Sequence, residues 1–489
     1  RLKLLNALSK ATRAVSVRSP LPVLTGIKFD LKSDQLILTG SDSDITIQTI
    51  IDQDDDLEII KEGAVVLNSR YIFDIVRKIN SDDIEIEIID GLLTRIKGSQ
   101  IEYSLNGTDA VEYPRIDLSK TGTHFIMSSL VLKNIIGETK FAASDKETRP
   151  ILTGIKFDLL EDGLVLTASD SDISIQTTIN EGIIINQTGS VVLSSKYILE
   201  IIRKIDGDTV HIQVVDGTLT RITSESSLFD LNGSKSFDFP RIDLNKNGKH
   251  FSMKSYDFKK IIEKTLFATS EQETRPVLTG VNFKVDQHQL VCIATDSYRL
   301  AQVSMPIEDD IQFNIVIPKK SLNQIIHIIE KDEMIDLYVS DRKVLFVIGQ
   351  YLVLTRLIDG TYPNTSRLVE DQGSYTMSIN SSALLGAISR ASLLSDEQSN
   401  IVKLTMSPDE NVLSSYSQEI GSVEENLTKA FYKGEPMTIS FSAKYLADAI
   451  RSIGTETIQL RFTEKMRPFQ ITGLDVNDNI QVVLPVRTY

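Results

Sequence analysis

The sequence predicts an α+β protein made of four copies of one unit, each with two helices packed on antiparallel sheet. Three observations predict this class. One segment recurs along the chain, as LPVLTGIKFDL from Leu21, RPILTGIKFDL from Arg149 and RPVLTGVNFKV from Arg275. Each copy holds two stretches whose apolar residues recur at three- and four-residue spacing, which is typical of amphipathic helices. Other stretches alternate apolar and polar residues, which is typical of half-buried strands.

The recurring segments divide the chain into four repeats, which we name by number. Repeat one covers residues 1–122, repeat two 123–248, repeat three 249–372 and repeat four 373–489. Repeats one and two are close copies, since SDSDITIQT and YIFDIVRKI return as SDSDISIQT and YILEIIRKI. Repeats three and four are more distant versions of the same plan. Such self-similarity predicts domains joined edge to edge as a segment of a ring or array.

Within a repeat, the predicted elements follow one order. The first helix is expected at LLNALSKATRAVS from Leu4, LKNIIGETKFAAS from Leu132, FKKIIEKTLFATS from Phe258 and LLGAISRASLLS from Leu384. Two strands around a turn follow, as in GIKFDLKSDQLILTGSD of repeat one. The second helix is expected at YIFDIVRKI, YILEIIRKI, SLNQIIHII and YLADAIRSI, and further strands such as DIEIEIIDGLLTRIKG close the repeat. Two helices with several antiparallel strands in each repeat give the α+β class.

The composition excludes several classes of protein. The chain of 489 residues has a net charge of −15, which argues against a broad basic face that coats nucleic acid but allows a basic strip beside an acidic outer surface. No apolar run is long enough for a membrane span, so we expect no membrane association. The single cysteine, Cys292, permits no disulfide within one chain, and a reduced, cytoplasmic location is expected.

Basic residues recur on the predicted helices. Lys10, Lys264 and Arg390 fall at the same position of the first helix in three repeats, while Glu138 occupies it in repeat two. Recurring cations in an acidic protein suggest one shared surface for phosphate groups, and such contacts need no reading of the bases. The alternative is that these are ordinary solvated charges on helix faces, since about a quarter of the residues in typical proteins are charged.

The sequence contains no GxxxxGK[ST], GxSxG, HExxH or CxxC motif, so we expect no enzyme activity and no cofactor. The paired aspartates of SDSD, Asp42 with Asp44 and Asp170 with Asp172, suggest either a metal site or a polar strand edge or turn. A strand edge or turn is favoured because no third and fourth ligand accompanies them, and no metal is expected. A nuclease with carboxylates gathered from several strands stays open as an alternative.

Several segments, taken in order, resemble the bacterial DNA polymerase III beta subunit (beta sliding clamp) family. ETRPVLTGVNF from Glu273, CIATDSYRLA from Cys292 and RLIDGTYPNTSRL from Arg356 are similar to its middle domain. QEIGSVEE, MRPFQI and the terminal VVLPVRTY resemble its third domain, and RAVSVRSPLPVLTGIKF with LNGTDAVEYPRI resembles its first. Repeat two begins like a middle domain and continues like a first domain, so the chain resembles a clamp with a duplicated first domain.

The resemblance implies a non-catalytic processivity factor that encircles double-stranded DNA without sequence preference. Family members have three such domains, and two chains close a ring, so a ring-forming homodimer is expected. Implied partners are the DNA polymerase III alpha subunit, the clamp loader and other proteins with clamp-binding motifs. Positions that match the family's DNA-facing surface or extend it to the other repeats are Lys10, Arg13, Arg18, Arg77, Lys78, Lys133, Arg149, Arg203, Lys204, Lys260, Lys264, Arg275, Arg390 and Arg451.

The resemblance also implies a peptide-binding pocket between repeats three and four. Matching positions are Leu278, Thr295, Ser297, Tyr298, Arg299, Leu300, Pro363, Arg367, Leu368, Val482, Val483, Leu484, Pro485, Val486 and Arg487. Its apolar floor would hold an aliphatic or aromatic anchor of the peptide, while Arg299 and Arg367 reach polar groups. Repeat two has SDI where repeat three has SYRL, so one pocket per chain is predicted.

The chain-to-chain contact implied by the family joins first and third domains edge to edge. The matching positions are Ile75, Tyr103 and Leu105 in repeat one and Leu393 and Leu394 in repeat four. Two chains of four repeats would form a wider ring of eight. The alternative is a protein of the same fold that acts as an interaction scaffold, binding motif peptides without encircling DNA.

Overall fold

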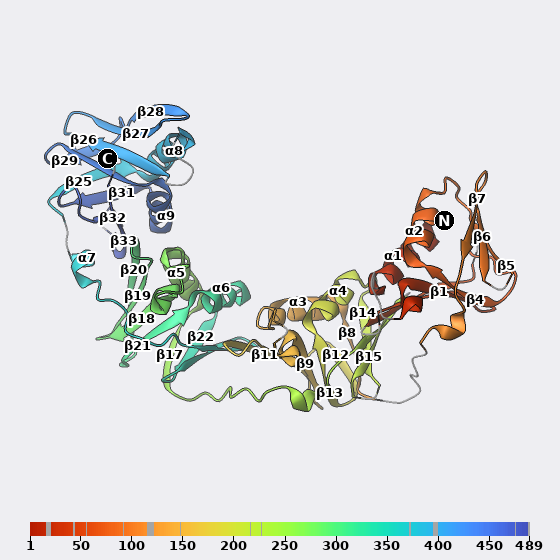
Figure 1. The fold of residues 1–489 in the computed structure, drawn as a ribbon. Coiled ribbons are helices and arrows are strands. Elements are labelled where there is room, and N and C mark those ends of the chain that lie inside the picture. The colour runs from red at the N-terminus through yellow and green to blue at the C-terminus, as the bar shows by residue number, and fades with distance from the viewer. Residues whose placement is uncertain are drawn as a thin grey trace. The chain divides into compact units, whose positions relative to one another are not determined.

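The structure is a computed structural model that describes residues 1–15, 21–42, 45–54, 56–90, 92–114, 122–146, 148–215, 217–225, 227–370, 373–394, 400–474 and 476–487. It contains two compact units, Arg1–Asp243 and Leu244–Tyr489 (Figure 1). Each unit is described by itself. Helices and antiparallel strands alternate in both, which confirms the predicted α+β class. Among the described residues, every helix is too short or too polar to reach across a bilayer.

The first unit contains repeats one and two. Repeat one consists of α1 (Leu2–Ala11), β1 (Gly26–Leu31), β2 (Gln35–Ser41), β3 (Ile45–Asp52), β4 (Gly63–Asn68), α2 (Ser69–Lys78), β5 (Glu85–Asp90), β6 (Leu93–Lys97) and β7 (Glu102–Asn106). Repeat two consists of β8 (His124–Ser128), α3 (Ser129–Lys140), β9 (Gly154–Leu159), β10 (Leu164–Ser169), β11 (Ile173–Ile179), β12 (Ile183–Gln187), β13 (Gly189–Ser194), α4 (Ser195–Lys204), β14 (Thr209–Val214), β15 (Leu219–Ser224) and β16 (Ser227–Asn232).

The second unit contains repeats three and four. Repeat three consists of β17 (Lys249–Lys254), α5 (Ser255–Thr265), β18 (Gly280–Asp286), β19 (Gln289–Thr295), β20 (Arg299–Pro306), β21 (Phe313–Pro318), α6 (Lys319–Ile328), β22 (Met334–Val339), β23 (Lys343–Ile348), β24 (Tyr351–Arg356) and the short α7 (Ser366–Glu370). Repeat four consists of β25 (Tyr375–Asn380), α8 (Ser381–Ala391), β26 (Ile401–Met406), β27 (Asn411–Ser417), β28 (Gly421–Asn426), β29 (Phe431–Lys433), β30 (Met437–Ser442), α9 (Ala443–Ile453), β31 (Thr457–Phe462), β32 (Phe469–Gly473) and β33 (Val476–Val483).

The second helix of each repeat forms because its apolar stripe faces the sheet and its first turn is often capped. In α2, Ile72 and Val76 are buried four residues apart, as helical periodicity requires. The Asn68 side chain accepts a hydrogen bond from the Tyr71 backbone N–H, and Ser442 caps α9 in the same way through Tyr445. Arg77 lies in the last turn of α2, where a cation interacts favourably with the helix dipole.

The recurring LTG segment is a short 3-10 turn that anchors the start of a sheet strand. In repeat one, Leu24 of this turn is buried against Val66 and Tyr113, and equivalent clusters form around Leu152 and Leu278. A side chain at Gly26 would place its Cβ 2.9 Å from the carbonyl oxygen of Leu67. The segment therefore recurs because its leucine fills a small core and its glycine permits close strand approach.

Each unit contains a continuous sheet that passes from one repeat into the next. In the first unit the strand order is β12-β8-β14-β15-β16-β3-β2-β1-β4, so β16 of repeat two pairs with β3 of repeat one. In the second unit the order is β21-β18-β19-β20-β33-β32-β31-β25-β29, so β20 of repeat three pairs with β33 of repeat four (Figure 1). In both joints, the third strand after one repeat's first helix pairs antiparallel with another repeat's last strand.

Candidate functional site

The SDSD segments form turns whose aspartates hold the backbone. The Asp170 carboxylate accepts hydrogen bonds from the backbone N–H groups of Asp172 and Ile173, at 3.0 and 2.9 Å. Asp42 accepts one from Ile45 at 2.8 Å, while Asp44 lies outside the described residues. These contacts agree with the favoured turn interpretation. In the part of the chain that the structure describes, no group of three or more potential metal ligands is found.

Repeat three has the same turn with different side chains. Asp296 accepts hydrogen bonds from the backbone N–H groups of Tyr298 and Arg299, at 2.9 and 3.0 Å. Ser297 adopts a φ of +76°, and Ser171 at the same place in repeat two has +82°. A serine with positive φ is strained unless its surroundings hold it. The turn is thus common to repeats two and three, and what distinguishes repeat three is the Tyr298–Arg299 pair.

The Arg299 side chain crosses the joint between repeats three and four. Its Nε donates to Asp296 at 3.0 Å, its Nη1 to Asp448 on α9 at 2.8 Å, and its Nη2 to the Phe267 carbonyl at 2.7 Å. The guanidinium also lies 4.5 Å from the ring centre of Tyr445. Groups of the protein itself therefore bind this guanidinium, while the contact of Arg299 with a peptide stays a prediction.

The other predicted pocket residues fall into a buried floor and an exposed surface. Leu278, Thr295, Leu300, Val482 and Val483 are buried. The partly or well exposed members are Ser297, Tyr298, Pro363, Arg367, Leu368, Leu484, Pro485, Val486 and Arg487.

Hydrogen bonds bring these segments together. The Leu484 backbone N–H donates to the Tyr298 carbonyl at 3.0 Å, so the chain after β33 continues along the turn. The Tyr362 hydroxyl accepts a hydrogen bond from the Thr295 backbone N–H at 3.0 Å. The Gln470 side chain donates to the Leu368 carbonyl at 2.9 Å, which attaches α7 to repeat four. Burial raises the pKa of the Tyr362 hydroxyl, which stays protonated.

Most predicted DNA-facing cations lie exposed on helices or in the turns that follow them. The exposed members are Arg13, Arg77, Lys78, Lys133, Arg149, Arg203, Lys204, Lys260, Arg275, Arg390 and Arg451. Four of them pair with acids: Arg77 with Asp74 at 2.6 Å, Arg451 with Asp448 at 3.2 Å, Arg390 with Glu425 at 2.5 Å, and Lys260 with Asp257 at 3.8 Å. Such exposed pairs are weak because water and salt screen them, so phosphate groups can compete for these cations.

Lys10 pairs with an acid of the neighbouring repeat. Its ammonium group lies 2.7 Å from the Asp206 carboxylate and 3.5 Å from the Ser227 hydroxyl, both in repeat two, and its side chain is only 12% exposed. Lys10 therefore belongs to the joint between repeats one and two, because its helix lies beside that joint. Lys264, at the equivalent position, is partly buried, and Arg18 lies outside the described residues.

The predicted chain-contact residues lie near two sheet edges. Ile75, Tyr103 and Leu105 pack partly buried against the core of repeat one, and β7 is the outer strand of the sheet β5-β6-β7. In repeat four, β28 is the outer strand of the sheet β28-β27-β26-β30. Leu393, in the 3-10 turn Ser392–Leu394, is 75% exposed, whereas Leu394 is partly buried.

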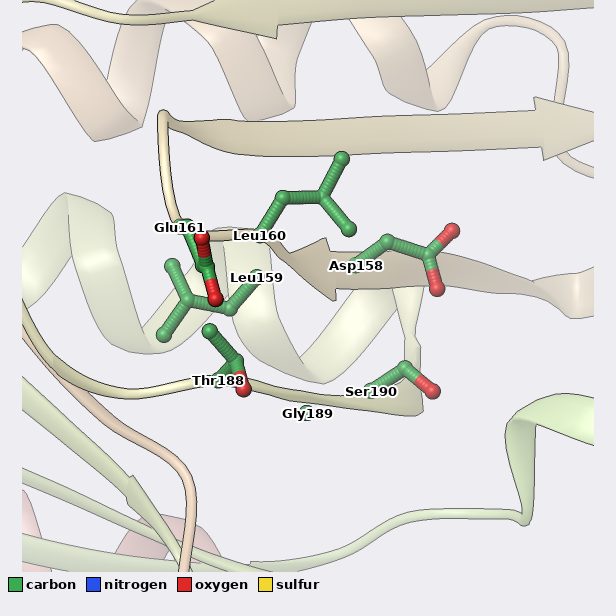
Figure 2. Close-up of a pocket in the computed structure, with 7 residues that line it drawn as sticks. All are labelled: Asp158, Leu159, Leu160, Glu161, Thr188, Gly189 and Ser190. Atoms are coloured by element: carbon green, nitrogen blue, oxygen red, sulfur yellow. The ribbon is translucent and has the colours of Figure 1, made fainter.

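A separate hollow of about 340 Å³ lies where β9 ends and β13 begins in repeat two (Figure 2). Asp158 and Glu161 are among the residues that line it, and Asp158 pairs with Lys156 at 2.9 Å. Carboxylates disfavour a phosphate backbone, so this hollow is not a candidate for DNA contact.

Sequence reasoning missed Asp448 and Tyr445, which fix Arg299 from α9. A signal was present in the sequence, because Tyr445, Asp448 and Arg451 repeat the spacing of Tyr71, Asp74 and Arg77 in α2. That pattern alone does not reveal the partner, since Arg299 lies 149 residues away in the chain.

The family models of the DNA polymerase III beta subunit match nearly the whole chain. The model described as its N-terminal domain matches twice, at residues 1–117 and 123–243. The central domain matches residues 252–364 and the C-terminal domain residues 367–487.

Individual relatives agree with these matches. The beta sliding clamp of Bacillus subtilis (strain 168) is 40% identical over 359 residues, which cover 71% of this chain and 95% of the relative. That of Halalkalibacterium halodurans is 38% identical over 379 residues, covering 75% of this chain and all of the relative. A crystal structure of the DNA polymerase sliding clamp from Bacillus subtilis has a TM-score of 0.73 at 38% identity, covering 76% of this chain and 100% of that one. The chain therefore belongs to the DNA polymerase III beta subunit family, the beta sliding clamps, and matches the family's N-terminal domain twice.

Proposed function

We propose that this protein is a non-catalytic sliding clamp that encircles duplex DNA and tethers the replicative polymerase and other DNA-processing proteins. The observation that carries the proposal is the family match across all four repeats, together with the two sheet joints that pair the same strands. We divide the chain into four clamp domains at the repeat boundaries given above. A cytoplasmic location fits the single cysteine, Cys292, which is buried.

DNA contact would come from the exposed helix cations. They lie on α2, α3, α4, α5, α8 and α9, so every repeat contributes at least one. Phosphate contacts of this kind are independent of sequence and weaken as salt rises. An acidic protein with such a strip would slide rather than bind tightly, because the attraction is confined to one surface.

Ring closure would come from the two outer strands. In both joints the third strand after the first helix of one repeat pairs with the last strand of another. The outer strand β28 is the third strand after the first helix of repeat four, and β7 is the last strand of repeat one. We therefore propose that β28 of one chain pairs with β7 of a second chain, since exposed strand edges are templates for pairing. Two chains would then form a closed homodimeric ring.

Topological retention tests encirclement. The full chain is loaded onto nicked circular plasmid with a clamp loader and passed through a sizing column at moderate salt. We expect it to elute with the circle and to be released when the plasmid is cut once. Equal retention on circular and linear DNA would contradict encirclement, and no retention on either with intact peptide binding would support the scaffold alternative.

Peptide binding is expected at one site per chain. Repeat three carries Tyr298 and Arg299 in the turn, whereas Ile45 and Ile173 occupy the position of Arg299 in repeats one and two. Isoleucine at this position cannot form an ion pair with a neighbouring helix as Arg299 does with Asp448. Calorimetric titration of the full chain with a peptide from the clamp-binding segment of a DNA polymerase III alpha subunit should give one peptide per chain. A value of two would show that another joint also binds.

A further inference from the structure

We infer that Asp448, which lies on α9 outside the predicted pocket residues, is a positioning residue for the peptide-binding turn 296–299. The inference rests on the proposed function, because it assigns a role within the same site. In the described part of the chain, the Asp448 carboxylate accepts hydrogen bonds from Arg299, a predicted peptide position, and from Arg451, which is not one. Its effect on a peptide would therefore pass through Arg299.

Both oxygens of the Asp296 carboxylate bind groups of the turn. Asp296 Oδ1 accepts from the backbone N–H groups of Tyr298 and Arg299, while Oδ2 accepts from the Arg299 Nε. The side chains of Asp296 and Arg299 are only 14% and 11% exposed. Ser297 in this turn has a positive φ, which costs conformational energy and is offset by contacts that hold the turn.

Helix α9 of repeat four contacts the turn through the Arg299 side chain. The Arg299 Nη1 lies 2.8 Å from Asp448 Oδ2, and Asp448 is 22% exposed. The guanidinium lies over the Tyr445 ring from the same helix. Because the pair is largely shielded from water, removing one partner leaves a poorly solvated charge and releases the other side chain.

The position of the turn determines two parts of the peptide-binding surface. The Tyr298 side chain, 61% exposed, projects from the turn, and the Tyr298 carbonyl accepts from the Leu484 N–H. A shift of the turn would move both the tyrosine and the chain after β33. A fixed surface binds a flexible peptide more tightly because less ordering is left to the binding step.

The chain contains a matched control for Asp448. Asp74 on α2 occupies the same helical position in repeat one and also pairs with the arginine three residues later, Arg77, at 2.6 Å. In repeat one, Ile45 stands where Arg299 stands in repeat three. Asp74→Asn thus changes the same helix position and leaves the Arg299–Asp448 contact intact.

The first test measures the turn without any ligand. Amide hydrogen exchange of the full chain should be faster at Tyr298 and Arg299 in Asp448→Asn than in the unmodified chain, by about ten-fold. Asp74→Asn should leave exchange at these two amides unchanged. Equal exchange at these amides in Asp448→Asn and in the unmodified chain would overturn the inference, whether or not a peptide binds.

The second test uses a fluorescein-labelled peptide from the clamp-binding segment of a DNA polymerase III alpha subunit. We expect Asp448→Asn to raise the Kd about ten-fold and Asp448→Glu to restore most of the affinity. In an Arg299→Ile background, Asp448→Asn should cause no further loss, because the two residues act as one unit. Equal losses in Asp448→Asn and Asp74→Asn would overturn the inference. Absence of binding to the unmodified chain would instead refute the proposed peptide-binding function.

Discussion

Leu393→Asp is expected to abolish the homodimer and, with it, retention on circular DNA. Leu393 is 75% exposed in the described chain, so the substitution removes little from the core of repeat four. In the proposed ring it would lie beside the β28 edge that meets β7 of the second chain. An aspartate there would bury an unpaired charge in the contact, which is among the most damaging changes at an interface.

Light scattering after size exclusion checks this result. We expect the mass to fall from that of two chains to that of one, while the peptide titration still gives one site. Phe431→Asp is the control, because Phe431 lies in the same repeat and is 79% exposed. A dimer that persists in Leu393→Asp, or one that is lost equally in Phe431→Asp, would contradict the proposed contact.

Phe441→Ala is expected to destabilise the second unit by about 3–5 kcal/mol while the first unit keeps its stability. Phe441 on β30 is fully buried, and its ring centre lies 5.5 Å from that of Phe469 on β32. Phe469 in turn stacks on Phe462 at 5.2 Å. The truncation would open a cavity between two sheets of repeat four, and rigid strands collapse poorly around such a cavity.

Hydrogen exchange under native conditions distinguishes the two units. Amides of repeat four should lose protection in Phe441→Ala, whereas amides of repeats one and two should not, since the chain divides into two compact units. Tyr416→Ala, at a side chain that is 74% exposed in the same repeat, should change stability by less than about 0.5 kcal/mol. Equal loss of protection in both units would show that they unfold together.

The repeat plan and the element types were predictable because they depend on local periodicity. The spacing of Ile72 and Val76 places both on one helix face regardless of what the rest of the chain does. The SDSD turn was predictable for the same reason, since an aspartate side chain caps its own backbone within three residues.

The partners of long charged side chains were not predictable, because distant segments supply them. Asp206 of repeat two holds the ammonium group of Lys10 in repeat one. Asp448 of repeat four, together with Asp296, holds the guanidinium of Arg299 in repeat three. Repetition of a cation in sequence indicates a shared helix position but does not reveal the acid, which lies in the neighbouring repeat for Lys10 and in the same repeat for Arg390.

The head-to-tail strand pairing at the two joints has a consequence for how such chains evolve. An interface whose two sides differ does not itself limit how many domains join. The assembly closes into a ring only when the rotation angles at successive joints sum to a full circle. Six domains require roughly 60° at each joint and eight require roughly 45°, so a duplication needs only a small change in angle, spread over all joints. A gene could therefore acquire an extra clamp domain in one recombination step and reuse the existing strand edges unchanged. Domain number would then be a heritable variable of the ring, set by joint geometry rather than by the fold of any one domain.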